Sequence, residues 1–328
     1  MDYIIGLDGG GTTTRALLAD SKGSVYADTV AGPSNLNAVS ETVVQETLKQ
    51  VFSDLKKQAP QLFFKATIVF CGIAGSSTVY NSSKLHEVLK EISPSFASIF
   101  LEIDALNALY SGTLGNPGIV QIAGTGTISY GIDQEKNQLR LGGWGHLLGD
   151  EGSGYSIGRQ AITLALKVYD GRENPDILSE NVFEFFCTKT GEKLINKVYA
   201  AESPRELIAS ASKCVFAAYQ QKDINATIII NRACQEISNN IIAIYRKLWQ
   251  DESEIKVVLC GGVFNDSSVM PPIIQENLNQ QMNLLKILLP ELPPVGGSII
   301  GGILTKEKQI NEQTVFNLTK NLMKNRKV

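Results

Sequence analysis

Short apolar runs and amphipathic stretches alternate along the first third of the chain. Residues 3–7 form an apolar run, residues 13–19 have the alternating character of a strand, and residues 25–30, after a turn, predict a third strand. Over residues 41–58 apolar side chains recur every three or four positions, which predicts a helix with Ser40 as its N-cap. We therefore expect three antiparallel strands before the first helix.

Single strands and helices follow in alternation. Residues 65–71 predict a buried strand, residues 82–92 a helix and residues 97–103 a further strand. The resulting order is three strands, helix, strand, helix, strand. It is typical of a ribonuclease-H-like domain, in which helices flank a mixed sheet.

The same series of patterns then begins again. Residues 119–123, 128–132 and 138–141 predict three strands, and a glycine-rich turn separates the first two, as in the opening segment. This recurrence suggests an internal duplication. We therefore expect an α/β protein of two ribonuclease-H-like domains around a central cleft. The first domain spans residues 1–115, and the second, with helical insertions, spans residues 116–328.

Helical spacing dominates the remainder. Residues 153–168 and 225–250 predict two helices, and residues 312–325 predict a terminal one. Residues 203–206 read as a capping box with proline at the first helical position, opening a helix to about residue 221. Residues 254–259 predict a strand that runs into two glycines.

Length and charge narrow the possible functions. A chain of 328 residues is longer than a typical single core, which supports two domains. Its net charge of -3 gives no general attraction for nucleic acid or for an anionic membrane, and we expect neither as a partner. We see no apolar run of membrane-spanning length and no signal-peptide pattern, so a cytoplasmic location is expected.

Cysteine and histidine are sparse. The five cysteines are scattered without a CxxC pair, which favours buried free thiols in a reducing compartment. The two histidines are too few for a histidine-based metal centre.

Three consecutive glycines follow the first strand. Gly9, Gly10 and Gly11 let the backbone approach an anion and free its N–H groups to bind it, and Thr12 adds a hydroxyl donor. A tight hairpin turn is the other interpretation of this motif alone. A strand rather than a helix follows the glycines, so this is not the dinucleotide fingerprint. Asp8, at the strand end, is well placed to hold a hydrated Mg²⁺ near phosphates.

Two further corners strengthen the phosphate interpretation. Residues 124–127 read Gly-Thr-Gly-Thr between two predicted strands, and two such loops would grip a triphosphate from both sides. Gly261 and Gly262 follow another strand and suit contact with adenosine. Three glycine-rich turns of this kind in one chain make it much less plausible that each is only a tight turn without a ligand.

Two aspartates are candidates for chemistry. Asp104 follows a strand directly, where it is either a helix N-cap or a general base that takes the proton of an attacking hydroxyl. Residues 141–154 hold six glycines around Trp144 and Asp150. Trp144 would give a sugar an apolar face, and Asp150 would accept hydrogen bonds from its hydroxyl groups. The alternative is that Asp150 merely caps the helix that follows.

With these residues in place, the chain resembles the N-acetylglucosamine kinase and BadF/BadG/BcrA/BcrD ATPase family, which has the fold of actin, hexokinase and heat-shock-chaperone ATPases. The marks of the resemblance, in order, are Asp8–Thr12, Pro33-Ser34-Asn35, Asp104-Ala105, residues 123–127 and residues 142–154. The resemblance covers nearly the whole chain and implies an ATP-dependent sugar kinase that uses ATP and Mg²⁺.

The resemblance also implies a role for individual residues. Those expected to bind ATP are Gly9, Gly10, Gly11, Thr12, Thr125, Gly126, Ala217, Gly261 and Gly262. Those expected to bind the sugar are Asn35, Asp104, Thr127, Gly143, Trp144 and Asp150. Asp104 would also be the catalytic base, and Asp8 would hold Mg²⁺ through water.

The expected substrate is an amino sugar, first N-acetylglucosamine at its 6-hydroxyl. Ile128 departs from the polar character of the N-acetylglucosamine kinases at this turn, so glucosamine and N-acetylmuramic acid stay open. The main alternative function is a BadF-type ATPase that activates a partner acyl-CoA dehydratase or reductase, although no cysteine arrangement here matches its iron–sulfur cluster. A chaperone-like ATPase and a sugar-responsive regulator are further alternatives. We also expect a homodimer.

Overall fold

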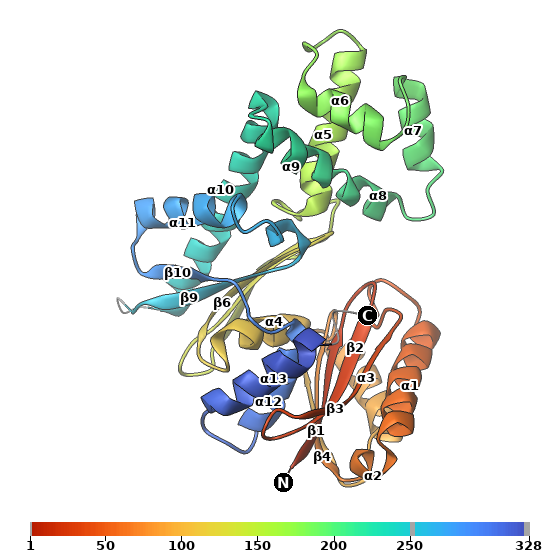
Figure 1. The fold of residues 1–328 in the computed structure, drawn as a ribbon, viewed down its shortest axis with the longest axis vertical. Coiled ribbons are helices and arrows are strands. Elements are labelled where there is room, and N and C mark those ends of the chain that lie inside the picture. Colours follow the sequence, from red (N-terminus) through yellow and green to blue (C-terminus); the bar gives the residue numbers. More distant parts are fainter. Residues whose placement is uncertain (1, 250–252, 325–328) are drawn as a thin grey trace. The chain divides into compact units, whose positions relative to one another are not determined.

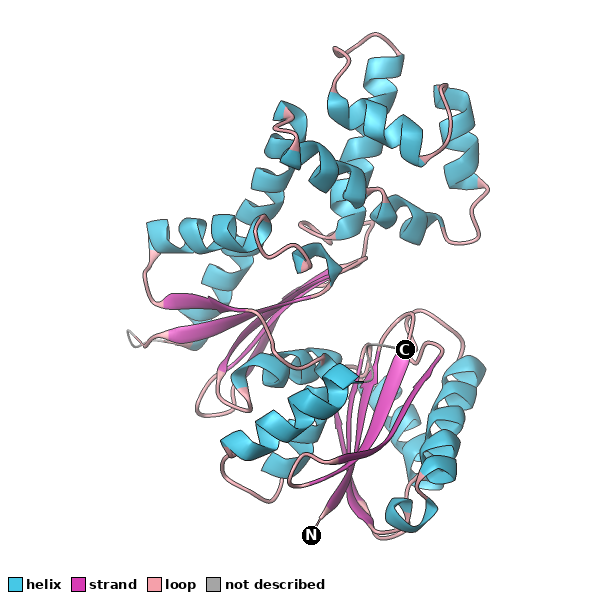
Figure 2. Ribbon diagram, viewed as in Figure 1, coloured by secondary structure: helices cyan, strands magenta, loops and turns pink. Residues whose placement is uncertain are grey.

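The computed structural model describes residues 2–249 and 253–324, and it contains two five-stranded sheets with helices around them (Figure 2). The chain divides into two compact units. One consists of Met1–Asn116 together with Leu289–Val328, and the other of Pro117–Leu288. We call them unit 1 and unit 2.

Unit 1 has the sheet order β3-β2-β1-β4-β5. The strands are β1 (Tyr3–Gly9), β2 (Thr14–Asp20), β3 (Val25–Ala31), β4 (Ala66–Ile73) and β5 (Ser98–Glu102). The first three are antiparallel, whereas β1, β4 and β5 run parallel. Parallel strands end at the same edge of a sheet, so the residues that follow β1, β4 and β5 gather at one edge.

Helices cover both faces of this sheet. On one face lie α1 (Glu41–Gln58) and α3 (Val79–Ile92), and on the other α4 (Asp104–Thr113) and α12 (Pro294–Leu304) (Figure 1). The apolar stripe of α1 forms as its periodicity predicts, because Val44, Leu48 and Val51 are buried against the sheet. Burial of each such side chain contributes about 1.5–3 kcal/mol. The short α2 (Pro60–Phe63) and the terminal α13 (Glu312–Lys324) complete the unit.

Unit 2 repeats the arrangement. Its sheet order is β10-β9-β6-β7-β8. The strands are β6 (Gly118–Ala123), β7 (Thr127–Ile132), β8 (Gln138–Gly142), β9 (Ile255–Cys260) and β10 (Leu285–Leu288). Again the first three are antiparallel, and β6, β9 and β10 run parallel. Both units therefore have the same strand order and the same strand directions, and the predicted α/β fold with two such sheets is confirmed.

Unit 2 has helices that pack on its sheet and further helices that pack chiefly on one another. The long α10 (Ile224–Leu248) runs over β6, β7 and β8, with α11 (Met270–Gln281) beside it. The remaining helices form the upper part of Figure 1. They are α5 (Gly154–Tyr169), α6 (Ile177–Phe185), α7 (Gly191–Tyr199), α8 (Pro204–Ser210) and α9 (Ser212–Gln220).

The sequence-based division into residues 1–115 and 116–328 assigns the C-terminal segment to the second domain, whereas the structure groups it with the first. Residues from Leu289 onward belong to unit 1, because α12 packs on α4 and on β1. Glycines make this packing possible. A Cβ on Gly297 would overlap the carbonyl oxygen of Asn107, and one on Gly6 would overlap the Ser298 hydroxyl.

Other local predictions also differ from the structure. Ser203 makes no side-chain capping bond, and the helix expected from residue 203 to about 221 is split into α8 and α9. The expected helix ends at residues 250 and 325 lie outside the described residues. No disulfide forms among the described residues, and Cys187 is exposed rather than buried as expected. Within residues 2–249 and 253–324 no helix is long and apolar enough to cross a membrane.

Candidate active site

The turn between β1 and β2 in unit 1 is built as the glycines predict. The N–H of Gly10 donates to the carbonyl oxygen of Thr13 at 2.9 Å, which closes the turn. Gly11 and Thr12 are exposed, and their backbone N–H groups donate to no other group in the part of the chain that the structure describes. Two adjacent N–H groups of this kind can bind an anion.

Asp8 stands beside this turn, at the end of β1. Its carboxylate accepts a hydrogen bond from Asn107 Nδ2 at 3.0 Å. Burial raises the pKa of Asp8 to about 7, the Asn107 hydrogen bond opposes this shift, and repulsion by Asp104 adds to it. The repulsion indicates that Asp8 and Asp104 lie near each other.

Asp104 is the first residue of α4, directly after β5. Ile103 is the N-cap of this helix, so the alternative that Asp104 is the N-cap is wrong. The Asp104 side chain is partly exposed at the same sheet edge as Asp8. A carboxylate at this place is able to accept a proton from a bound hydroxyl group.

Asn35 reaches the same edge from the loop after β3. Its Oδ1 accepts a hydrogen bond from the N–H of Asn37 at 2.9 Å, and the side chain lies over Gly75, in the turn after β4. Gly75 has a φ of 80°, a left-handed conformation that favours glycine, and it leaves the space that Asn35 fills. Unit 1 thus brings Asp8, the glycine turn, Asn35 and Asp104 together.

The second glycine turn, between β6 and β7 in unit 2, is tied to the start of α5. The N–H of Gly154 donates to Gly124 O at 2.8 Å, and that of Tyr155 donates to Thr125 O at 3.3 Å. The carbonyl oxygens of the turn are therefore occupied. The N–H groups of Thr125 and Gly126 donate to nothing within the described chain, as in the first turn.

The third glycine corner adjoins the second. Gly261 has a φ of 107° and packs so closely on Ala123 that a Cβ would overlap its carbonyl oxygen. Gly262 begins a short 3-10 helix, and Ala217 lies on the exposed side of α9. A hydrogen bond of 3.1 Å from Gln220 to Asp266 joins α9 to this corner. The residues predicted to flank adenosine are thus on neighbouring elements.

Asp150 is held inside unit 2. It has a φ of 66° and is 2% exposed. Its Oδ1 accepts from the N–H of Thr127 at 3.2 Å, and its Oδ2 pairs with Arg205 Nη2 at 3.1 Å. The cap of α5 is Ser153, not Asp150. Two of the acceptor positions of this carboxylate are therefore in use, which leaves others for a ligand.

Trp144 occupies a separate place in the same glycine-rich stretch. Trp144 is 70% exposed, and the Arg140 guanidinium lies 4.9 Å from the centroid of its ring. Arg140 also donates to Gly143 O at 2.6 Å, and Gly143 lies against Ile128. No bond joins Trp144 or Gly143 to Asp150 among the described residues, although Thr127 contacts Asp150 directly.

Sequence reasoning missed two residues of these sites. Asn107 is fully buried and donates to Leu7 O and Gly72 O as well as to Asp8, so it links α4 to β1 and β4. The only sequence signal was a polar residue between the apolar positions Leu106 and Ala108. Arg205 and Asp150 are 55 positions apart in the sequence, and no local pattern predicts that they pair.

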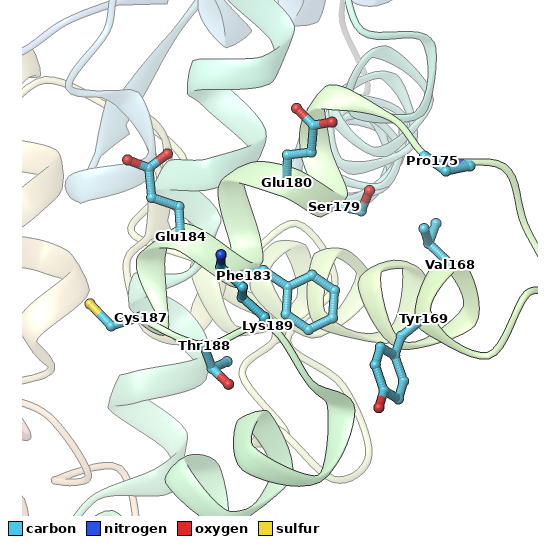
Figure 3. Close-up of a pocket in the computed structure, with 10 residues that line it drawn as sticks. All are labelled: Val168, Tyr169, Pro175, Ser179, Glu180, Phe183, Glu184, Cys187, Thr188 and Lys189. Carbon is cyan, nitrogen blue, oxygen red and sulfur yellow. The ribbon is translucent and has the colours of Figure 1, made fainter.

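A pocket of about 770 Å³ lies elsewhere in unit 2, among α5, α6 and the segment that leads to α7 (Figure 3). The rings of Phe183 and Tyr169 lie near each other there, with centroids 6.1 Å apart and planes tilted by 52°. None of the predicted site residues lines this pocket.

The chain is similar to several known proteins along nearly its whole length. The chain is 30% identical over 300 residues to an N-acetylmuramic acid/N-acetylglucosamine kinase from Clostridium acetobutylicum, covering 92% of this chain and 98% of that protein. It is 28% identical to an N-acetyl-D-glucosamine kinase from Dictyostelium discoideum, covering 93% of this chain and 99% of that one. A solved structure from Chromobacterium violaceum, provisionally named an N-acetylglucosamine kinase, has a TM-score of 0.70 and 25% identity over 92% of this chain and 98% of its own.

The family model described as "BadF/BadG/BcrA/BcrD ATPase family" matches residues 5–300. The match includes both glycine turns, Asp104 and Asp150. The chain belongs to the BadF/BadG/BcrA/BcrD ATPase family.

Proposed function

We propose that this protein is an ATP-dependent kinase that transfers the γ-phosphoryl group to a hydroxyl of an amino sugar. The observation that carries the proposal is the grouping in unit 1 of a turn with open N–H groups, an amide side chain and two carboxylates. Phosphoryl transfer requires little more than this, because it depends on a positioned nucleophile, a base and neutralised phosphate charge.

Each residue has one task in this proposal. Asn35 hydrogen-bonds the sugar, and Asp104 accepts the proton of the attacking hydroxyl. The backbone N–H groups of Gly11 and Thr12 bind phosphate oxygens, as do those of Thr125 and Gly126 in unit 2. Ala217, Gly261 and Gly262 flank adenosine.

Asp8 is the residue we propose to hold Mg²⁺ through water. Its carboxylate fits a hard cation, because oxygen is the ligand that Mg²⁺ prefers and because a cation offsets the burial and repulsion that raise the pKa of Asp8. When bound, the ion neutralises charge on the phosphates of ATP. Asn107 orients Asp8 by donating a hydrogen bond to its carboxylate.

The finer choice of sugar is N-acetylglucosamine, at the 6-hydroxyl. The names of two full-length relatives support an amino sugar, and one of them also names N-acetylmuramic acid. Trp144 offers an apolar face, and Asp150, whose carboxylate the N–H of Thr127 holds in place, offers an oxygen acceptor. Glucosamine and N-acetylmuramic acid are the competing substrates. The homodimer and the cytoplasmic location stay predictions, and light scattering on the purified chain tests the first.

An ATP-consumption screen tests the proposal. The purified chain is assayed with N-acetylglucosamine, glucosamine, N-acetylmannosamine, N-acetylmuramic acid and glucose, and each assay has a matched sample without sugar. We expect N-acetylglucosamine to stimulate ADP release most. If no sugar stimulates ADP release, the kinase proposal is wrong, and a steady sugar-independent rate would favour the activator or chaperone-like ATPase instead.

A further inference from the structure

A guanidinium group lies against the second glycine turn. Arg205, near the start of α8, donates from Nη2 to Asp150 Oδ2 at 3.1 Å. The Arg205 side chain is 42% exposed, whereas that of Asp150 is 3% exposed. A Cβ on Gly126 would lie only 2.8 Å from the same nitrogen. The charge is therefore held close to the backbone of the turn while part of it faces solvent.

Most of the donor capacity of Arg205 is unused. A guanidinium has five N–H donors, and within residues 2–249 and 253–324 this one donates a single hydrogen bond, to Asp150. Arg15 gives the contrast, because its Nε and Nη2 both donate to Asp28, at 2.9 and 2.6 Å. Arg15 forms a closed bidentate pair, and Arg205 does not.

The backbone around Arg205 presents donors as well. The carbonyl oxygens of Gly124 and Thr125 accept bonds from the start of α5, whereas the N–H groups of Thr125 and Gly126 donate to no group in the described chain. Open N–H groups and a guanidinium with spare donors are thus adjacent at Gly126. Such a group of donors matches the oxygens of a phosphate.

We propose that Arg205 is a phosphate-binding residue, donating hydrogen bonds to the terminal phosphates of a nucleoside triphosphate held at Thr125 and Gly126. The bond to Asp150 keeps the guanidinium beside the turn. This inference rests on the proposed function only in so far as that function assigns the turn to ATP. It does not depend on which sugar is phosphorylated.

Nucleotide binding without sugar tests the inference. The affinities of ATP, ADP and adenosine for the full chain are measured by calorimetry for wild type, Arg205→Ala and Arg205→Lys. Loss of a charge-assisted bond to phosphate should weaken ATP and ADP binding about 10- to 100-fold and change adenosine binding less than about twofold. Arg205→Lys should lie between, because lysine keeps the charge but not the planar fork.

Arg172→Ala is the matched control. Arg172 pairs with Asp170 at 2.7 Å beyond the far end of α5, which is roughly 24 Å long. This variant should bind all three ligands as wild type does. Gly126→Ala is a second perturbation, because its Cβ would displace the Arg205 nitrogen, and it should weaken ATP and ADP in the same selective way. Thermal melts verify that each variant is folded.

Two results would overturn the inference. One is unchanged ATP and ADP affinity in Arg205→Ala. The other is equal weakening of adenosine, ATP and ADP, which would mean that Arg205 only supports the fold around Asp150. The proposed kinase function fails separately, through absence of sugar-stimulated ADP release by the wild type. A selective loss of ATP affinity in Arg205→Ala would uphold the role of Arg205 even then.

Discussion

The half-buried carboxyl of Asp8 should make the stability of unit 1 depend on pH, and Asp8→Asn should remove this dependence. Asp8 has a pKa of about 7 in the folded chain, against an ordinary value of 3.8. Between these two values the folded chain holds a proton that the unfolded chain has released. Stability therefore falls as the pH rises through this window, which is the opposite of a carboxyl whose pKa is lowered by folding.

The size of the effect follows from the shift. Each pKa unit corresponds to about 1.36 kcal/mol, so a shift of about three units amounts to about 4 kcal/mol when Asp8 is fully ionised. Asparagine keeps the shape and can still accept from Asn107, but it carries no charge. We therefore expect Asp8→Asn to be more stable than wild type by up to about 4 kcal/mol above pH 7, and equal to it below pH 4.

Urea unfolding at a series of pH values between 4 and 8, in EDTA, measures this difference. Asp54→Asn is the control, because Asp54 forms a surface pair with Lys57 at 3.2 Å that should contribute little. The same Asp8→Asn protein should lose ATP-dependent turnover, since its proposed ligand for hydrated Mg²⁺ is gone. A stability difference between wild type and Asp8→Asn that does not change with pH would mean that burial does not raise the pKa of Asp8.

Three further predictions concern the base, the sugar and the packing of α12. Asp104→Asn should cut kcat at least about a hundredfold and leave sugar affinity nearly intact, as calorimetry and turnover assays check, and near-wild-type kcat would refute its role as base. Asn35→Ala should raise the KM for sugar about tenfold or more with a smaller effect on kcat, and an unchanged KM would remove Asn35 from the sugar site. Gly297→Ala should destabilise the fold by about 1–3 kcal/mol or more, because its Cβ would lie 2.8 Å from the Ser111 nitrogen and overlap the Asn107 backbone. A melting temperature equal to that of wild type would contradict this packing.

Candidate site residues that directly follow a strand could be predicted from the sequence. The turn at Gly9–Gly11 and the aspartate directly after residues 97–103 can be located because strands end where apolar runs end. Parallel strands then bring such positions to one edge, which is why Asp8 and Asp104 lie near each other. The repeated order of strands likewise needs only hydrophobic patterning.

Features that depend on distant contacts were not visible. The return of the C-terminal segment to unit 1 depends on Gly297 of α12 fitting against α4, a contact between residues far apart in the sequence. The bond from Asn107 to Asp8 spans 99 positions, and that from Arg205 to Asp150 spans 55. The capping box expected at Ser203 did not form, although α8 does begin at Pro204.

The proposed reaction is the transfer of a phosphoryl group from ATP to an amino sugar. The most direct measurement follows ADP and sugar phosphate together, by a coupled assay and by mass spectrometry, with N-acetylglucosamine and with its 6-deoxy analogue. We predict one sugar phosphate for each ADP released with N-acetylglucosamine, and none with the 6-deoxy analogue. ADP release that is the same with and without every amino sugar, and with no phosphorylated sugar formed, would contradict the account.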